Sequence, residues 1–197
     1  MSLYPFIVFI HIAAAAILVG GSVLAGPLVR AAARRTRATQ DLRAFLTLAH
    51  TLEAVDPIVA MVVLASGVYL TSVSNFWTFG WVQVSTAFWM ASSFVAVGVV
   101  KPLLGRLAAE AKAAADAQVS ERLNALRWSA RWTYGGDFLA ATDAAVLYLM
   151  TMKPGLFCSL AVVAAAYILI FAVRLVVGRS RPVVAERSEP ATVTAPR

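Results

Sequence analysis

Three ionisable side chains and a proline stand together at one end of an apolar stretch. The segment "AHTLEAVDPIVAMVVLASGVYL" places His50, Glu53 and Asp56 at steps of three residues, and Pro57 follows directly. On a helix these steps spread the three side chains over an arc of about 120°. Proline has no N–H to bond the carbonyl of Glu53, so we expect a helix break at Pro57 and a free carbonyl oxygen beside two carboxylates.

Two kinds of chemistry fit this group of side chains. Carboxylates beside a freed carbonyl are suited to binding a cation or relaying protons, and ionisable groups inside membrane spans are often functional. The structural alternative is a water-filled vestibule with ion pairs to a basic residue such as Lys101 or Arg131, without any transport. The sequence shows no activated nucleophile, no phosphate-binding loop and no metal-spaced set of ligands, so we expect no catalytic residue and no metal site, and an enzyme is disfavoured.

A second candidate is His11, within "FIHIAAAAILVGGSVLAGP". Small residues recur four apart along this helix and, together with Gly20 and Gly21, they predict close packing against another helix. Counted at about 1.5 Å per residue, His11 lies roughly 12 Å from the outer end of its span and Asp143 roughly 14 Å from the outer end of another. His11 and Asp143 can therefore meet, and we expect His11 to be hydrogen-bonded either to Asp143 or to a backbone carbonyl.

Haem b is the alternative partner of His11. Gly20 and Gly21 would then make room for the macrocycle, with His11 as its single histidine ligand. A bis-histidine haem with His50 is excluded, because the axial offset between the two histidines comes to about 20 Å.

Depth counting groups the ionisable residues of the spans into two layers. Gly136 begins a stripe of small residues in "GGDFLAATDAA", which predicts a close-packed helix carrying two acids. The predicted outer layer contains His11 and Asp143, and the predicted inner layer contains Glu53, Asp56, Asp137 and His50.

These residues must be positioned by membrane helices. Hydrophobic residues make up 60% of the 197 residues and charged residues 14%, against about 25% charged in an average soluble domain. The apolar runs are continuous and long enough for helices that cross a hydrocarbon core of about 30 Å, and they lack the alternation of barrel strands. We predict an all-α bundle with five spans, at residues 3–30, 45–72, 80–103, 132–152 and 155–177.

The basic residues predict the orientation. They gather in the first and third connections and after the last span, whereas Lys153 alone lies on the other side. Because Lys and Arg concentrate in cytoplasmic loops, we expect the N-terminus outside and the C-terminus in the cytoplasm of a bacterial inner membrane. The net charge of +7 is then a topology signal that also suits anionic lipids, and no nucleic-acid partner is expected.

The chain reads as one domain with a tail. Residues 1–179 are expected to form a single bundle, with a solvated cytoplasmic helical extension near residues 104–131 where Ala, Leu, Glu, Lys and Arg are abundant. Residues 180–197 are polar, aperiodic and contain proline, so a disordered tail is expected.

Several stretches resemble the bacterial integral membrane family called domain of unknown function 2269. They are "FIHIAAAAILVGG", "VLASGVYL", "WVQVSTAFWMASSF" and "VLYLMTMKPG", and the resemblance runs to about Gly155. It implies a multi-span membrane protein and names no reaction. The first span is also similar, more weakly, to protoporphyrinogen oxidase and copper-resistance membrane proteins, some of which handle haem or metal, although a further histidine at a matching depth is missing here.

Three functions fit these observations. The first is a non-catalytic accessory or binding subunit of a larger redox or bioenergetic membrane complex, with other membrane subunits or further copies of the chain as partners. The second is a haem b or porphyrin protein that uses His11. The third is a proton- or cation-coupled transporter that uses Glu53, Asp56 and Asp137.

Overall fold

The computed structural model describes residues 3–115 and 118–179, so the expected tail at 180–197 lies outside the described residues. The described chain folds into helices joined by short connections, which confirms the all-α fold class. The elements are α1 (Leu3–Val19), the π-helical turn η1 (Gly20–Ala25), α2 (Gly26–Arg35), α3 (Thr39–Val73), the short η2 (Phe76–Thr78), α4 (Gly80–Val95), the π-helical turn η3 (Ala96–Val100), α5 (Lys101–Ala113), α6 (Glu121–Arg127), α7 (Ala130–Met152) and α8 (Leu156–Arg179).

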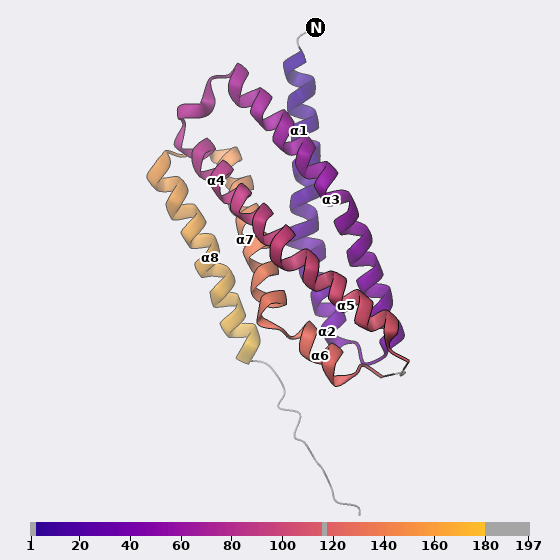
Figure 1. Cartoon of the computed structure of the whole chain (residues 1–197). Coiled ribbons are helices and arrows are strands. Elements are labelled where there is room, and N and C mark those ends of the chain that lie inside the picture. Colours follow the sequence, from indigo (N-terminus) through magenta and orange to yellow (C-terminus); the bar gives the residue numbers. More distant parts are fainter. Residues whose placement is uncertain (1–2, 116–117, 180–197) are drawn as a thin grey trace, which may run out of the picture.

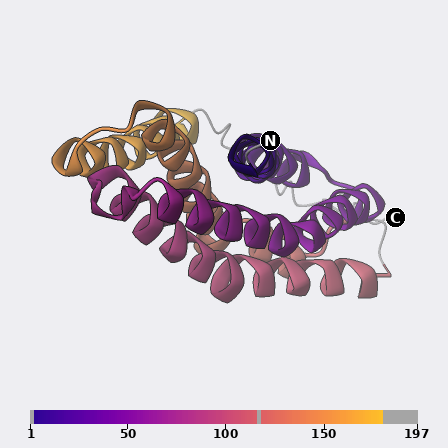
Figure 2. The ribbon, with the colours of Figure 1, turned by 90° about the horizontal axis from the view of Figure 1, so that it is seen from above.

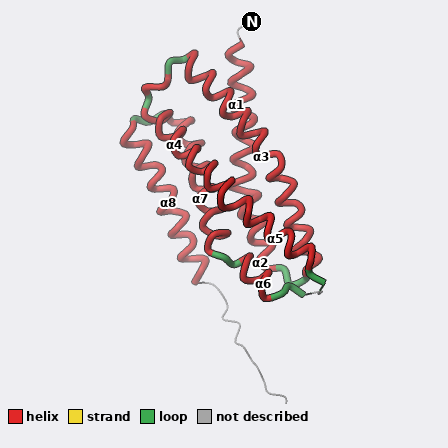
Figure 3. The backbone as a smooth tube through the Cα atoms, in the orientation of Figure 1, coloured by secondary structure: helices red, strands yellow, loops and turns green. Residues whose placement is uncertain are grey.

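Long helices running side by side dominate the molecule (Figure 1). The π-helical turns join α1 to α2 and α4 to α5, so that two uninterrupted helices of 33 and 34 residues result. Figure 3 shows the connecting loops gathered at the two ends of the bundle. Figure 2 shows the same helices from above. We call the end with the N-terminus and the α3–α4 turn the upper end, and the end with α6 the lower end.

Within the part of the chain that the structure describes, four helices are long and apolar enough to cross a membrane: residues 3–35, 39–73, 80–113 and 156–176. The fifth predicted span is α7, whose 23 residues extend over about 34 Å but are less apolar. It packs against α4, α8, η1 and η3, and eleven of its residues are buried. Because neighbouring helices enclose it, α7 can carry glycine and aspartate without exposing them to lipid.

The apolar core has two parts. The lower cluster joins α2, α3, α5 and α6 around Leu42, Leu46, Leu104 and Leu107, while the upper cluster joins α4, α7 and α8 around Leu149. The expected solvated extension near 104–131 is therefore wrong for α5, since its leucines are buried against α3. Along α7 the lower cluster ends at Trp132 and the upper one begins at Ala145, so both aspartates of this helix lie between the two clusters.

Arginines close the lower end by bonding the last carbonyls of two helices. Arg127 Nη1 donates to the carbonyl oxygens of Ala33 at 2.8 Å and Thr36 at 2.6 Å, where α2 ends. Arg43 donates to the carbonyls of Ala111, at 2.6 Å, and Ala114, where α5 ends. The final carbonyls of a helix have no partner within it, so these basic side chains satisfy them.

Candidate functional site

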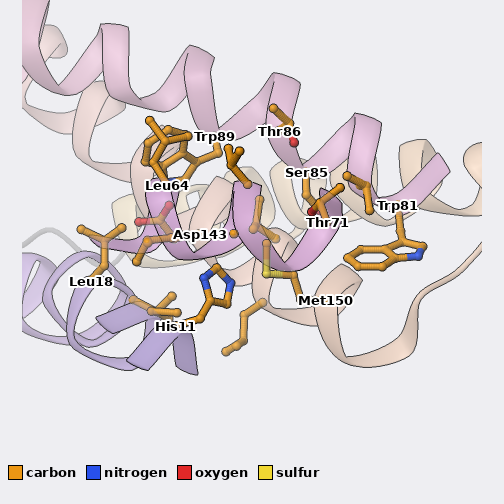
Figure 4. A pocket seen from close by; sticks show the side chains of 18 of the residues that line it. His11, Leu18, Leu64, Thr71, Trp81, Ser85, Thr86, Trp89, Asp143 and Met150 are labelled. Carbon is orange, nitrogen blue, oxygen red and sulfur yellow. The ribbon is translucent and has the colours of Figure 1, made fainter. Parts of the chain in front are cut away.

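A cavity of about 120 Å³ opens between α1, α3, α4 and α7 in the upper half of the bundle (Figure 4). Its wall is mostly apolar and includes three indole rings. Polar side chains reach it from all four helices. The residues that matter for its chemistry are His11 on α1, Thr71 on α3, Ser85 and Thr86 on α4, Asp143 on α7, and the indoles of Trp77, Trp81 and Trp89.

His11 is held by α3 rather than by Asp143. Its Nδ1 lies 2.9 Å from Ser66 Oγ, and that hydroxyl donates its hydrogen to the carbonyl of Val62 at 2.5 Å. The hydroxyl has a single hydrogen, so it accepts the proton of Nδ1–H, which leaves the Nε2 lone pair of a neutral imidazole available as an acceptor. The ring also lies against Gly67, where an added Cβ would be 3.1 Å from His11 Cε1.

The alternative in which His11 is hydrogen-bonded to Asp143 is therefore wrong. The two residues do share the cavity, as Figure 4 shows, so the depth count brought them to the same level of the bundle. Asp143 is 8% exposed, and the polar side chains that act on its carboxylate are Ser22 of η1 and Asp56 of α3.

Three acids form a line from the lower half of the bundle to this cavity. The charge of Asp56 acts both on Glu53, one turn earlier on α3, and on Asp143 across the interface with α7. Lys101 is the cation that acts on Glu53 and Asp56. Among the described residues, buried Glu53 Oε2 has no hydrogen-bond partner. We call Glu53, Asp56 and Asp143 the acid line.

The π-helical turn η1 lies beside the acid line. A Cβ built on Gly21 would be 4.0 Å from Asp56 Oδ1, and one built on Gly20 would meet nothing within 4 Å. A π turn carries an extra residue per turn and is often found at functional sites. Here it places Gly21 beside Asp56 and Ser22 beside Asp143. The close packing expected at Gly20 is wrong, because an added Cβ there would meet no neighbour.

Asp137 belongs to a different cluster, so the predicted inner layer divides in two. Arg174 of α8 binds both carboxylate oxygens, with Nη2 at 2.7 Å from Oδ1 and Nε on Oδ2. Arg30 Nη2 lies 3.8 Å from Oδ1. The Arg30 guanidinium rests on Gly136, where an added Cβ would stand 2.3 Å from Nη1. Arg30 and Arg174 are among the basic residues that predict the orientation, and their ion pairs with Asp137 were not expected, although Arg174 stands within an apolar run.

Two further expectations on α3 are wrong. His50 is exposed rather than buried, because the neighbouring Ala49, with Leu46 and Leu42, occupies the face that packs into the lower cluster. Pro57 does not break the helix, since α3 runs without interruption from Thr39 to Val73. The missing N–H still leaves the carbonyl of Glu53 without its usual helical donor.

A haem does not fit this arrangement. A cavity of about 120 Å³ has the size of a single ring, whereas a porphyrin contains four pyrroles. Gly20 and Gly21, which were expected to make room for the macrocycle, lie on η1 and do not line the cavity of His11. Within the described residues, no group of three His, Cys, Asp or Glu side chains is arranged to hold a metal ion.

Comparison with known proteins agrees with the membrane architecture. The search among curated proteins and the search among solved structures each found no match. The family model described as "Predicted integral membrane protein (DUF2269)" matches residues 5–154, which extend from α1 to the turn after α7. The matched segment contains the cavity and the whole acid line. The chain therefore belongs to the DUF2269 family of integral membrane proteins.

Proposed function

We propose that this protein is a proton-coupled transporter whose acid line carries protons between the lower half of the bundle and the cavity. The supporting observation is the buried Glu53 Oε2, which lacks a hydrogen-bond partner among the described residues. A carboxylate that serves only architecture is normally paired, because an unpaired charge in an apolar interior is expensive. An unpaired acid inside a span is instead typical of a proton or ion pathway.

Asp137 provides the internal comparison. Its two oxygens are occupied by Arg174, and Arg30 stands next to it, so this carboxylate has the partners of a structural ion pair. Asp143 lies on the same helix and faces a cavity instead. The proposed route therefore uses Glu53, Asp56 and Asp143, and it omits Asp137, which the sequence had suggested.

In the proposed mechanism, protons enter or leave at Asp143 from the cavity and pass along α3. Asp56 is the middle site of the proposed route, because its charge acts on both of the other two acids. Gly21 of η1, which has no side chain, leaves space beside Asp56 for water that can bridge the carboxylates. The positive charge of Lys101 stabilises a negative charge on Glu53 or Asp56. The acid line can therefore lose and regain a proton without a second cation.

Proton flux into liposomes tests this proposal. Purified protein is reconstituted with a trapped pH-sensitive dye, a membrane potential is imposed, and internal acidification is followed. We expect flux with the parent protein and its loss in Glu53→Gln and Asp56→Asn, which keep side-chain shape but cannot carry a proton. Glu110→Gln is the matched control, because Glu110 pairs with the largely exposed Arg122 outside the acid line. Unchanged flux in both carboxamide variants would remove the proposal.

An accessory subunit of a larger membrane complex is the second candidate. The observation in its favour is the exposed apolar face of α1, which includes Phe6, Phe9 and Ile12 and is available to a neighbouring protein or to lipid. Isolation from the native membrane in a mild detergent tests this candidate. A partner present in fixed stoichiometry would favour it, and a protein that purifies alone yet carries protons would favour the transporter.

A further inference from the structure

We propose that the cavity binds a small protonated amine with an apolar body of about one ring. This proposal rests on the proposed function and extends it by naming the class of substrate. It is argued from the size of the cavity, the sign of its charge and the hydrogen-bonding groups in its wall.

The size of the cavity sets the size of the ligand. Its volume is about 120 Å³, and an apolar cavity of about 150 Å³ in another protein holds one benzene molecule. The wall is formed largely by aliphatic side chains and by the indole rings of Trp77, Trp81 and Trp89. Indole faces attract cations as well as apolar groups. One ring, or an aliphatic body of similar bulk, fits this space.

The wall of the cavity contains an acidic side chain, which becomes negatively charged when it loses its proton. Asp143 lines the cavity, and no lysine or arginine does so among the described residues. The nearest comparison is Asp137 on the same helix, whose charge is compensated by two arginines. An anionic ligand would meet a carboxylate without a compensating cation, whereas a cationic ligand would supply the missing partner of Asp143.

The hydrogen-bonding groups in the wall can accept from an ammonium group. Asp143 offers carboxylate oxygens, and His11 offers Nε2 because its Nδ1–H is taken by Ser66. Ser85 is the independent observation. It is 1% exposed, it lines the cavity, and its hydroxyl has no hydrogen-bond partner among the described residues. A buried hydroxyl left unpaired is costly, and a ligand with N–H groups would satisfy it.

The position of Asp143 couples this ligand to protons. A cationic amine binds the ionised carboxylate of Asp143 more strongly than the protonated carboxyl group. Entry of the amine therefore favours release of the proton from Asp143. The acid line gives that proton a route through Asp56 and Glu53. The exchange is balanced, because one cation enters the site as one proton leaves it.

Binding of benzylamine, with benzyl alcohol as its neutral counterpart, tests the proposal. Purified parent protein in lipid nanodiscs is titrated with each compound by calorimetry near neutral pH, where benzylamine is protonated. We expect saturable binding of benzylamine and binding of benzyl alcohol weaker by about tenfold or more, because a charge-assisted hydrogen bond is lost. Equal binding of the two compounds, or no saturable binding of benzylamine, would overturn the proposal.

Variants locate the site. Asp143→Asn should weaken benzylamine binding by about tenfold or more, and Ser85→Ala should weaken it by a smaller factor. Ser93→Ala is the matched control, since Ser93 lies on the same helix, bonds the carbonyl of Trp89 and does not line the cavity. If Asp143→Asn does not fold, Ser85→Ala and the pair of compounds still decide the matter. Unchanged affinity in Ser85→Ala together with equal binding of amine and alcohol would refute the site.

The two proposals fail in different ways. Amine binding without proton flux in liposomes would retain the cavity as an amine site and remove the transporter. Proton flux without amine binding would retain the transporter and remove this substrate class. Proton release on amine binding, measured in weakly buffered solution and absent in Asp143→Asn, would support both.

Discussion

The two aspartates of α7 show how the surroundings of a residue determine its use. Asp137 and Asp143 have the same side chain and similar burial, at 8% exposure each. Asp137 faces α8 and α2, which present arginines, whereas Asp143 faces a cavity lined by indoles and apolar side chains. The first arrangement favours a permanent charge and architecture, and the second favours an exchangeable partner.

At this scale we predict that Asp137→Asn destabilises the protein strongly. The substitution leaves Arg30 and Arg174 facing each other without a carboxylate in a largely apolar interior, and breaking a buried ion pair from one side costs about 3–5 kcal/mol. Thermal unfolding in detergent measures the loss. Glu110→Gln, which removes an exposed ion pair with Arg122, is the control and should change the melting temperature little. Equal melting temperatures for the two variants would contradict the structural role of Asp137.

At the scale of elements, the upper end depends on a close approach of two helix starts. A Cβ built on Gly80, the first residue of α4, would stand 2.4 Å from Leu156 Cα at the start of α8. Lys153 precedes this contact with a positive φ of 49°, and its Nζ lies 5.8 Å from the Phe76 ring centroid and 5.9 Å from that of Trp81. The α7–α8 turn is thereby attached to the α3–α4 connection, whose Trp77 lines the cavity.

We therefore predict that Gly80→Ala lowers the melting temperature, because the new methyl group meets backbone atoms that cannot move away without separating α4 from α8. Overpacking of this kind typically costs about 1–3 kcal/mol. Gly105→Ala is the matched control. Nothing lies within 4 Å of its added Cβ, and alanine in a helix interior is favoured over glycine by about 1 kcal/mol. A stability change of the same sign in both variants would argue against the close approach.

At the scale of the whole molecule, the long helices exceed the thickness of a bilayer. A helix of 33 residues extends over about 50 Å, against a hydrocarbon core of about 30 Å. We assign the excess to the lower end, where α2, α5 and α6 surround the lower cluster and arginines bond the helix ends. We propose that this basic end lies in the cytoplasm and that the upper end faces outward.

Thiol labelling tests this orientation in intact cells. The background carries Cys158→Ala, because the native thiol is exposed. We expect Thr78→Cys, in the exposed connection at the upper end, to react with an impermeant maleimide, and Lys112→Cys, exposed near the end of α5, to react only after the membrane is opened. The reverse pattern would invert the orientation and the direction of the proposed proton movement.

The membrane architecture could be predicted from sequence because its signals are local. Hydropathy and helical periodicity are properties of consecutive residues, and they located the helices and identified Glu53, Asp56 and Asp143 as acids inside or beside spans. Depth along a helix follows from a constant rise per residue, and His11 and Asp143, which the depth count placed at similar levels, line the same cavity.

Partner choice was decided only by the tertiary structure. Successive residues on a helix are about 100° apart, so a small rotation or tilt of one helix replaces one neighbour of a side chain with another. That rotation cannot be read directly from the sequence. The structure turned His11 toward Ser66, gave Asp137 the arginines of α2 and α8, and left His50 exposed. The cavity likewise depends on tertiary packing. Side chains from four helices, far apart in the sequence, leave a space unfilled where they meet.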